Sequence, residues 1–192
     1  MLSWGYELAE GASLPSIITT EQFALLTQNR MSSTPQQVQA MLDAASASIR
    51  GFCGWHLAPS VACVWRGDAP TGICQLPVMG MTAVTSVKLG GEVLDPTAYE
   101  WSTSGLVRLG HPVHRWGGVT VEFTAGYDDS ADIGAVVAQI AANALVASPG
   151  VREEHAGQVG ISYNQTAAGV SGGIALLDRD RMLLDRWRIR RV

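Results

Sequence analysis

Charged residues are scarce in this sequence. Asp, Glu, Lys and Arg make up 16% of its 192 residues, whereas soluble domains usually contain about 25%. Hydrophobic residues reach 47%, which excludes a chain that is disordered throughout, because disorder requires low hydrophobicity. The length suits one domain, or one domain with an excursion. The shortage of charge predicts that sister subunits cover part of the surface.

Residues that build common catalytic and metal sites are also few. The only lysine, Lys88, has no glycine-rich phosphate loop beside it. Three cysteines are present, an odd number, and their spacing matches no zinc pattern. They are Cys53, Cys63 and Cys74. The sequence therefore predicts no cofactor and no metal, and its cysteine content suits assembly in a reducing cytoplasm.

One pair of residues leaves an enzymatic alternative open. Cys53 and His56 lie three residues apart, just after a predicted helix, and a thiol nucleophile needs a neighbouring base of this kind. The ordinary interpretation, which we favour, is a buried cysteine beside a loop histidine. A thiol-dependent enzyme that uses Cys53 and His56 remains the alternative from another functional class.

Basic residues gather at the end of the chain. Residues 179–192 contain six arginines and two aspartates, a net charge of +4, so the remainder carries −8 of the total charge of −4. An acidic body with a basic tail predicts that the tail docks on an acidic partner. A DNA-binding module that uses the arginine tail is a second alternative, although the acidic body would repel a duplex.

Capping patterns predict two helices early in the chain. Thr19 and Gln22 fit a capping box at the start of a short helix. Its apolar contacts are expected from Phe23, Leu25 and Leu26. Thr34 followed by Pro35 is a stronger start pattern, and the apolar spacing after it predicts an amphipathic helix over roughly 35–50.

The hydrophobic period changes in the middle of the chain. Short segments rich in β-branched or aromatic residues follow at Val61–Trp65, Val84–Leu89, Glu92–Leu94, Tyr99–Trp101, Leu106–Arg108 and Val119–Phe123. Gly90-Gly91 fits a two-residue hairpin turn. Val119, Val121 and Phe123 alternate with polar residues, so one face of that strand is buried. These segments predict a small antiparallel sheet over about 60–125.

The uncharged run from Ile133 to Val151 is long enough to span a bilayer. Gln139, Asn143 and the break at Ser148-Pro149-Gly150 favour a buried helix over about 131–147 instead, so no membrane contact is predicted.

The last part of the chain predicts a loop and a helix. Residues 150–173 are rich in Gly, Ser, Asn and Gln, which predicts a flexible loop or an extended hairpin. An amphipathic helix is predicted near 175–188. One face of it is expected to carry Leu176, Leu177, Leu183, Leu184 and Trp187. The fold class is therefore predicted as α+β: a mainly helical bundle with an inserted antiparallel sheet and a C-terminal basic helix or tail.

The order of these elements resembles the head-to-tail connector, or adaptor, proteins of long-tailed bacteriophages. The residues that carry the resemblance are Thr19-Thr20-Glu21-Gln22-Phe23, Ala44–Arg50 leading to Cys53-Gly54-Trp55, Leu76-Pro77-Val78 followed by Val84-Thr85-Ser86-Val87 and Gly91, Gly105–Arg108 before Trp116, Val119–Tyr127, and Leu183–Arg188. The similarity covers about 19–192. It divides the chain into an N-terminal segment of unknown role (1–18), a connector domain (19–175) and a C-terminal basic tail (176–192).

The resemblance implies a structural virion protein without catalytic activity. Its members form a ring, commonly twelve-fold, at the head–tail junction between the portal protein and the next tail-joining (stopper) protein, and DNA passes through the central channel without specific binding. The C-terminal segment is implied to bind the portal. The residues expected to do so are Arg186, Trp187, Arg188, Arg190 and Arg191.

A second surface is implied within the flexible segment, which faces the channel or the next ring in the family. The residues expected there are Arg152, Glu153, Glu154, His155 and Tyr163. Deletion of residues 186–192 is expected to abolish portal attachment and to leave the fold intact. If the last helix packs on its own domain instead, the deletion would remove the fold as well.

Overall fold

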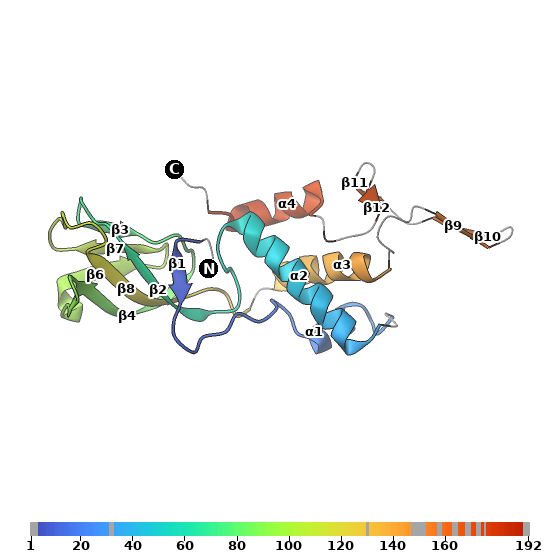
Figure 1. Cartoon of the computed structure of the whole chain (residues 1–192), viewed down its shortest axis with the longest axis horizontal. Helices are drawn as coiled ribbons and strands as arrows, with labels where there is room; N and C mark the ends of the chain where they lie inside the picture. Colours follow the sequence, from blue (N-terminus) through green and yellow to red (C-terminus); the bar gives the residue numbers. More distant parts are fainter. Residues whose placement is uncertain are drawn as a thin grey trace. The chain divides into compact units, whose positions relative to one another are not determined.

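A computed structural model describes residues 4–30, 33–129, 131–146, 153–156, 159–162, 165–167, 170–171, 174 and 176–189. The chain divides into two compact units (Figure 1). The sheet unit comprises Met1–Leu14, Cys53–Asp129 and Trp187–Val192, and the helix unit comprises Pro15–Phe52 and Ser130–Arg186. Each unit is therefore assembled from segments that are distant in sequence.

The sheet unit contains two antiparallel sheets. The first has five strands in the order β1-β2-β8-β4-β5. Their bounds are β1 Tyr6–Leu8, β2 Val61–Gly67, β8 Val119–Ala125, β4 Met81–Leu89 and β5 Glu92–Val93. The second has three strands in the order β3-β7-β6. These are β3 Ile73–Gln75, β7 Leu106–Leu109 and β6 Tyr99–Ser102, with the 3-10 turn η1 at Pro96–Ala98.

The six predicted strand segments are confirmed as β2, β4, β5, β6, β7 and β8, but they belong to two sheets instead of one, and β3 was not predicted. Val119, Val121 and Phe123 of β8 are buried, while the residues between them are partly exposed. Gly90 and Gly91 form the turn from β4 to β5 with φ of 60° and 101°. Two successive positive φ values are what a tight hairpin of this type requires, and glycine adopts them without strain.

The sheet extends beyond the region that the sequence predicted. β1 pairs antiparallel with β2, with Tyr6 opposite Trp65 and Leu8 opposite Cys63. The N-terminal segment, to which the sequence assigned no role, thus supplies an edge strand. A three-residue strand has too little alternation to be recognised from sequence.

Where the structure describes it, the helix unit contains four helices. They are α1 Thr20–Leu26, α2 Pro35–Cys53, α3 Ala131–Val146 and α4 Asp178–Leu184, and the 3-10 turn η2 (Asp185–Trp187) continues from α4. The capping box before α1 is confirmed, because the Thr19 and Gln22 side chains bond reciprocally to each other's backbone N–H groups. Thr34 and Gln37 make the same pair of bonds at α2.

The part of the uncharged run that the structure describes lies in α3, a helix buried along most of one side. Ile133, Val137 and Ile140 are at most 2% exposed. A Cβ atom on Gly134 would lie 3.0 Å from Ile18, so glycine permits the close approach of the segment before α1. Among the described residues, no helix is long and apolar enough to cross a membrane.

Three predictions about helices need correction. A mainly helical bundle is wrong, because eight strands form the two sheets of the sheet unit, seven of them between α2 and α3 in the sequence. In α1 only Phe23 is buried, while Leu25 and Leu26 face solvent. The last helix is also shorter than predicted. Leu183 is 59% exposed and Leu184 is 1% exposed, because neighbouring residues of a helix point about 100° apart.

Part of segment 150–173 forms two short antiparallel pairs. β9 (Glu153–Ala156) pairs with β10 (Val159–Ser162), and β11 (Gln165–Ala167) pairs with β12 (Val170–Ser171). An extended hairpin was one of the two predicted forms for this segment. Its flexibility remains a prediction.

Candidate functional site

Residues 187–189 are hydrogen-bonded within the sheet unit. The indole Nε1 of Trp55, which is fully buried, donates to the backbone carbonyl of Trp187 at 2.8 Å. The Ile189 N–H donates to the Cys53 carbonyl at 2.9 Å. These two bonds fix the backbone of the C-terminal segment, defined here as residues 187–189.

The Trp187 ring packs on its own chain. It lies edge-on against Tyr127, with ring centroids 4.8 Å apart, and Tyr127 in turn contacts Trp55 at 5.8 Å. Burial raises the pKa of the Tyr127 phenol. The indole of Trp187 nevertheless stays partly exposed. Trp187 therefore packs within its own chain and keeps part of its surface exposed.

The predicted portal-binding arginines differ in their surroundings. Arg186 forms an ion pair with Asp132 at 2.5 Å, with side chains 58% and 76% exposed, so this pair contributes little to stability. Arg188 is exposed. Arg190 and Arg191 lie outside the described residues. Helical structure ends at Trp187, and the portal-binding role of these arginines stays a prediction.

The residues predicted to line the channel or meet the next ring are only partly described. The backbone of Glu153, Glu154 and His155 belongs to β9, whereas Arg152 and Tyr163 lie outside the described residues. Their role stays a prediction.

His56 is a buried structural bridge. Its Nε2 lies 2.7 Å from the Ala125 carbonyl, and its Nδ1 lies 2.5 Å from the Tyr6 hydroxyl. A carbonyl only accepts, so Nε2 carries the proton and Nδ1 accepts from Tyr6. The Tyr6 hydroxyl also accepts from the His56 backbone N–H at 3.0 Å. Both ring nitrogens thus hold β1 and β8 together, which disfavours His56 as a base for Cys53.

Burial also disfavours thiolate chemistry at Cys53. The side chain is fully buried, and this burial raises the pKa of Cys53 from 9.0 to about 12, with a smaller opposing effect from Arg188. Reactive cysteines have lowered pKa values instead, because the thiolate is the nucleophile. Cys63 and Cys74 are buried in the same way. Burial raises the pKa of Cys63 to about 12 and the pKa of Cys74 to about 11.

These thiols make two outcomes measurable. Thiol reagents are expected to label the native protein poorly at pH 8 and to label all three cysteines after denaturation.

Because the unfolded chain releases the thiol protons near pH 9 and the folded chain retains them, the free energy of unfolding is expected to fall as pH rises above about 9. Cys53→Ser is expected to cost only a modest loss of packing. Rapid labelling of Cys53 in the folded protein would revive the enzymatic alternative.

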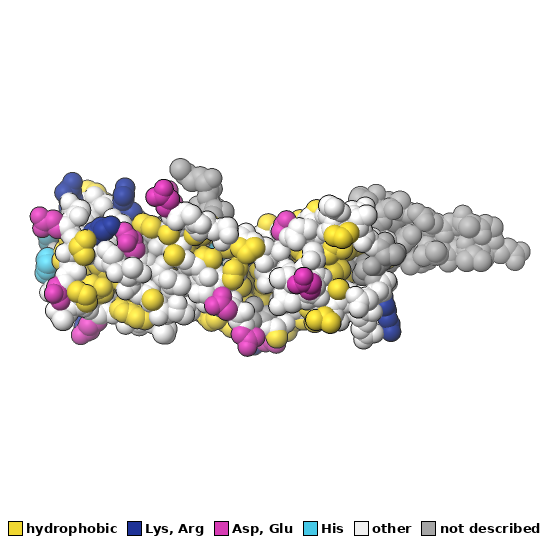
Figure 2. Space-filling model, turned by 90° about the horizontal axis from the view of Figure 1, so that it is seen from below, with side chains coloured by type: hydrophobic (Ala, Val, Ile, Leu, Met, Phe, Trp, Pro, Cys, Tyr) yellow, Lys and Arg dark blue, Asp and Glu magenta, His cyan; other side chains and the backbone are white. Residues whose placement is uncertain are grey.

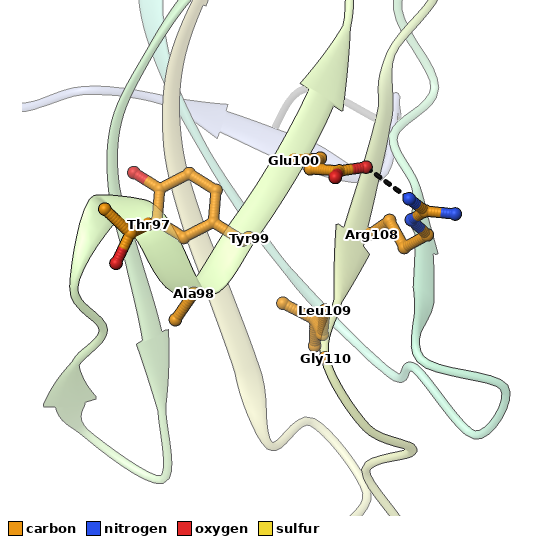
Figure 3. Close-up of a pocket in the computed structure, with 7 residues that line it drawn as sticks. All are labelled: Thr97, Ala98, Tyr99, Glu100, Arg108, Leu109 and Gly110. Atoms are coloured by element: carbon orange, nitrogen blue, oxygen red, sulfur yellow. Dashed lines mark hydrogen bonds and ion pairs between the residues drawn. The ribbon is translucent and has the colours of Figure 1, made fainter.

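A shallow hollow of about 420 Å³ lies beside the second sheet. It is lined by Thr97, Ala98, Tyr99, Glu100, Arg108, Leu109 and Gly110 (Figure 3). Glu100 and Arg108 point toward each other across β6 and β7 and form an ion pair at 2.5 Å, with side chains about two-thirds exposed. Among the described residues, no group of three or more His, Cys, Asp or Glu side chains is arranged to hold a metal. The hollow therefore offers no evident catalytic group.

Exposed apolar surface is more prominent on the described residues than any group of catalytic side chains. Figure 2 shows that charged side chains are sparse over the face it presents and that hydrophobic side chains reach the surface in several places. The exposed apolar residues with the largest fractions are Trp116 at 88%, Met182 at 75% and Leu25 at 74%. The sequence did not predict that these side chains are exposed, because burial at a given helix or loop position depends on tertiary packing.

Comparisons with known proteins agree with this emphasis. A family model described as "Head completion protein" matches residues 16–147. No curated protein sequence matches the chain.

Three solved chains with a similar fold come from gene transfer agent (GTA) particles. A chain from the "Neck of native GTA particle computed with C12 symmetry" is 20% identical, with 96% of each chain covered and a TM-score of 0.60. A chain from the "Virion of native gene transfer agent (GTA) particle" is 19% identical, with the same coverage and a TM-score of 0.59. A chain from the neck of the empty particle, computed with C6 symmetry, is 18% identical over 96% of each chain, with a TM-score of 0.57.

Proposed function

Because the chain belongs to the head completion protein family, we propose that it is the head-to-tail adaptor of a phage-like virion. In this role it forms a ring beneath the portal protein, joins the DNA-filled head to the tail, and leaves a channel for DNA. The stopper protein is its neighbour on the other side. The observation that carries the proposal is the family match over residues 16–147.

The proposed ring has support from the surface and from the similar folds. The similar chains come from necks computed with C12 and C6 symmetry, and both symmetries suit a twelve-fold ring. A chain with 16% charged residues and several exposed apolar side chains suits burial between subunits, since interface cores are depleted in charge.

The proposed channel requires that DNA pass without being held. Residues other than the basic tail carry a net charge of −8, because residues 179–192 carry +4 of the total of −4. An acidic surface repels phosphates, so it favours passage over binding. This balance supports an adaptor over a DNA-binding module.

The proposed portal contact is the exposed side of the C-terminal segment together with the arginines around it. Trp187 and Ile189 are held by bonds to the sheet unit, so the neighbouring Arg188 is presented from an ordered backbone. Arginine makes forked hydrogen bonds to carboxylates, which suits an acidic groove on the portal. No catalytic step belongs to this role.

Sedimentation with purified portal protein tests the proposal. The chain is expected to sediment with the portal at a fixed ratio of subunits, and the free chain is expected to remain in the supernatant. If the chain stayed in the supernatant with portal present, across a range of salt concentrations, the adaptor role would be refuted.

A further inference from the structure

Residues 4–8, here called the β1 segment, contact the turn that follows α2. The Tyr6 hydroxyl donates to His56 Nδ1 at 2.5 Å and accepts from the His56 backbone N–H at 3.0 Å. The Tyr6 ring also lies edge-on against the imidazole, with ring centroids 5.6 Å apart. Trp4 contacts the same imidazole, with centroids 6.4 Å apart. The β1 segment therefore holds His56 by two hydrogen bonds and two ring contacts.

The C-terminal segment is held by the residue next to His56. Trp55 donates its indole N–H to the Trp187 carbonyl at 2.8 Å and lies edge-on against His56, with ring centroids 5.3 Å apart. Tyr127 contacts both indoles, at 5.8 Å from Trp55 and 4.8 Å from Trp187. Ring contacts thus lead without a break from the β1 segment to the C-terminal segment. We call this set the aromatic series: Trp4, Tyr6, His56, Trp55, Tyr127 and Trp187.

Close packing around His56 leaves little space for independent movement. A Cβ atom on Gly126 would lie 2.5 Å from the Pro59 carbonyl oxygen and 3.0 Å from His56 Nε2. The Tyr127 N–H donates to the Leu57 carbonyl at 3.0 Å. Side chains packed this closely transmit a displacement to their neighbours, because no void absorbs it.

We propose that the β1 segment positions the C-terminal segment, with Tyr6 as the positioning residue and the aromatic series as the link. All of these residues belong to the sheet unit. While Tyr6 holds His56, the adjacent Trp55 keeps its N–H against the Trp187 carbonyl. Release of Tyr6 loosens Trp55, and residues 187–189 then detach more often. The consequence for portal attachment rests on the proposed function, whereas the coupling between the two segments does not.

Hydrogen exchange of the free, full-length chain tests the coupling. The Ile189 N–H, which is bonded to the Cys53 carbonyl, reports on the C-terminal segment. Tyr6→Phe keeps the ring and removes only the hydroxyl. We expect exchange at Ile189 to become about tenfold faster, because loss of a buried hydrogen-bond partner makes local opening more frequent. Exchange at the Leu109 N–H, which is bonded to the Gly72 carbonyl in the second sheet, is expected to stay unchanged.

Tyr99→Phe is the matched control. It makes the same chemical change on β6, outside the aromatic series, and is expected to leave exchange at Ile189 unchanged. Unchanged exchange at Ile189 in Tyr6→Phe would overturn the coupling. An equal rise at Ile189 and Leu109 would also overturn it, because it would show a general loss of stability in place of a local link.

The reverse direction gives a second test, since a coupling between two sites is reciprocal. Trp187→Ala removes the ring contact with Tyr127 and changes no residue of the β1 segment. The Ala9 N–H, which is bonded to the Ala62 carbonyl at 2.9 Å, is expected to exchange several-fold faster. Trp116→Ala, at an 88% exposed position, is expected to leave Ala9 unchanged. Unchanged exchange at Ala9 in Trp187→Ala would contradict the coupling.

These measurements separate the coupling from the adaptor role. They use the free chain, so a negative result in both directions would overturn the coupling and leave the adaptor role standing. Failure of the wild-type chain to bind the portal would refute the adaptor role and leave the coupling standing.

Discussion

Replacing Arg188, Arg190 and Arg191 together with glutamate is expected to abolish sedimentation with the portal while the fold persists. Arg188 is exposed, so its reversal costs little stability. Arginines desolvated at an interface contribute about 2 kcal/mol each, so losing three would weaken one contact by roughly a thousandfold or more. The proposed ring would repeat the contact in each subunit, which would multiply the loss through avidity.

A variant with the same change in net charge controls for general electrostatic effects. Arg30, Arg66 and Arg115 are exposed and lie outside the C-terminal segment, and their joint replacement with glutamate is expected to preserve attachment. Equal loss in both triple variants would show that net charge, and not this segment, governs attachment. Full attachment of the C-terminal variant would place the docking surface elsewhere.

These point substitutions are a cleaner test than deletion of residues 186–192. The deletion removes the Trp187 carbonyl that accepts from Trp55 and the Ile189 N–H that donates to Cys53. Leaving the buried Trp55 N–H without its acceptor costs about 1–3 kcal/mol. The deletion therefore affects packing and binding together, so its result cannot separate the two roles of this segment.

Trp55→Ala is expected to produce the largest loss of stability. The side chain is fully buried, donates to Trp187 and contacts the rings of His56 and Tyr127. Truncation of a buried tryptophan costs about 3–5 kcal/mol, which corresponds to a fall of roughly 10 °C in the thermal midpoint for a chain of this size. Thermal unfolding followed by circular dichroism measures the change.

Trp116→Ala is the matched control, because Trp116 is 88% exposed. Its effect on the unfolding free energy is expected to stay within about 0.5 kcal/mol. Trp55→Phe keeps an aromatic ring and loses only the N–H donor, so its cost should fall between the two. Similar thermal midpoints for Trp55→Ala and Trp116→Ala would show that the contacts of Trp55 with Trp187, His56 and Tyr127 do not stabilise the sheet unit.

Local patterns were sufficient to predict most of the secondary structure. The capping box at Thr19 depends on residues three apart, and the alternation in β8 depends on residues two apart, so both are visible in sequence. The Gly90-Gly91 turn is visible for the same reason, because only glycine adopts two such φ values readily. Long-range pairing was not predictable. The partner of Tyr6 in β1 is Trp65 in β2, and no local pattern links them.

The candidate site was predictable in part. The composition of the C-terminal tail, with Trp187 among arginines, predicts a portal-contact segment, and this stays a prediction; the packing of Trp187 against Tyr127 depends on the fold. The exposed side chains of Leu25 and Met182 were missed, because a short amphipathic pattern does not reveal which of its apolar residues find partners within the chain. In both cases the sequence determined the residue types, and tertiary packing determined which of them remained accessible.

Electron microscopy of the portal bound to this chain tests the adaptor role most directly. We expect a continuous ring of this chain as a separate layer beneath the portal, with an open central channel and the C-terminal segment at the portal surface. A portal without an added layer, or scattered copies that form no ring, would contradict it.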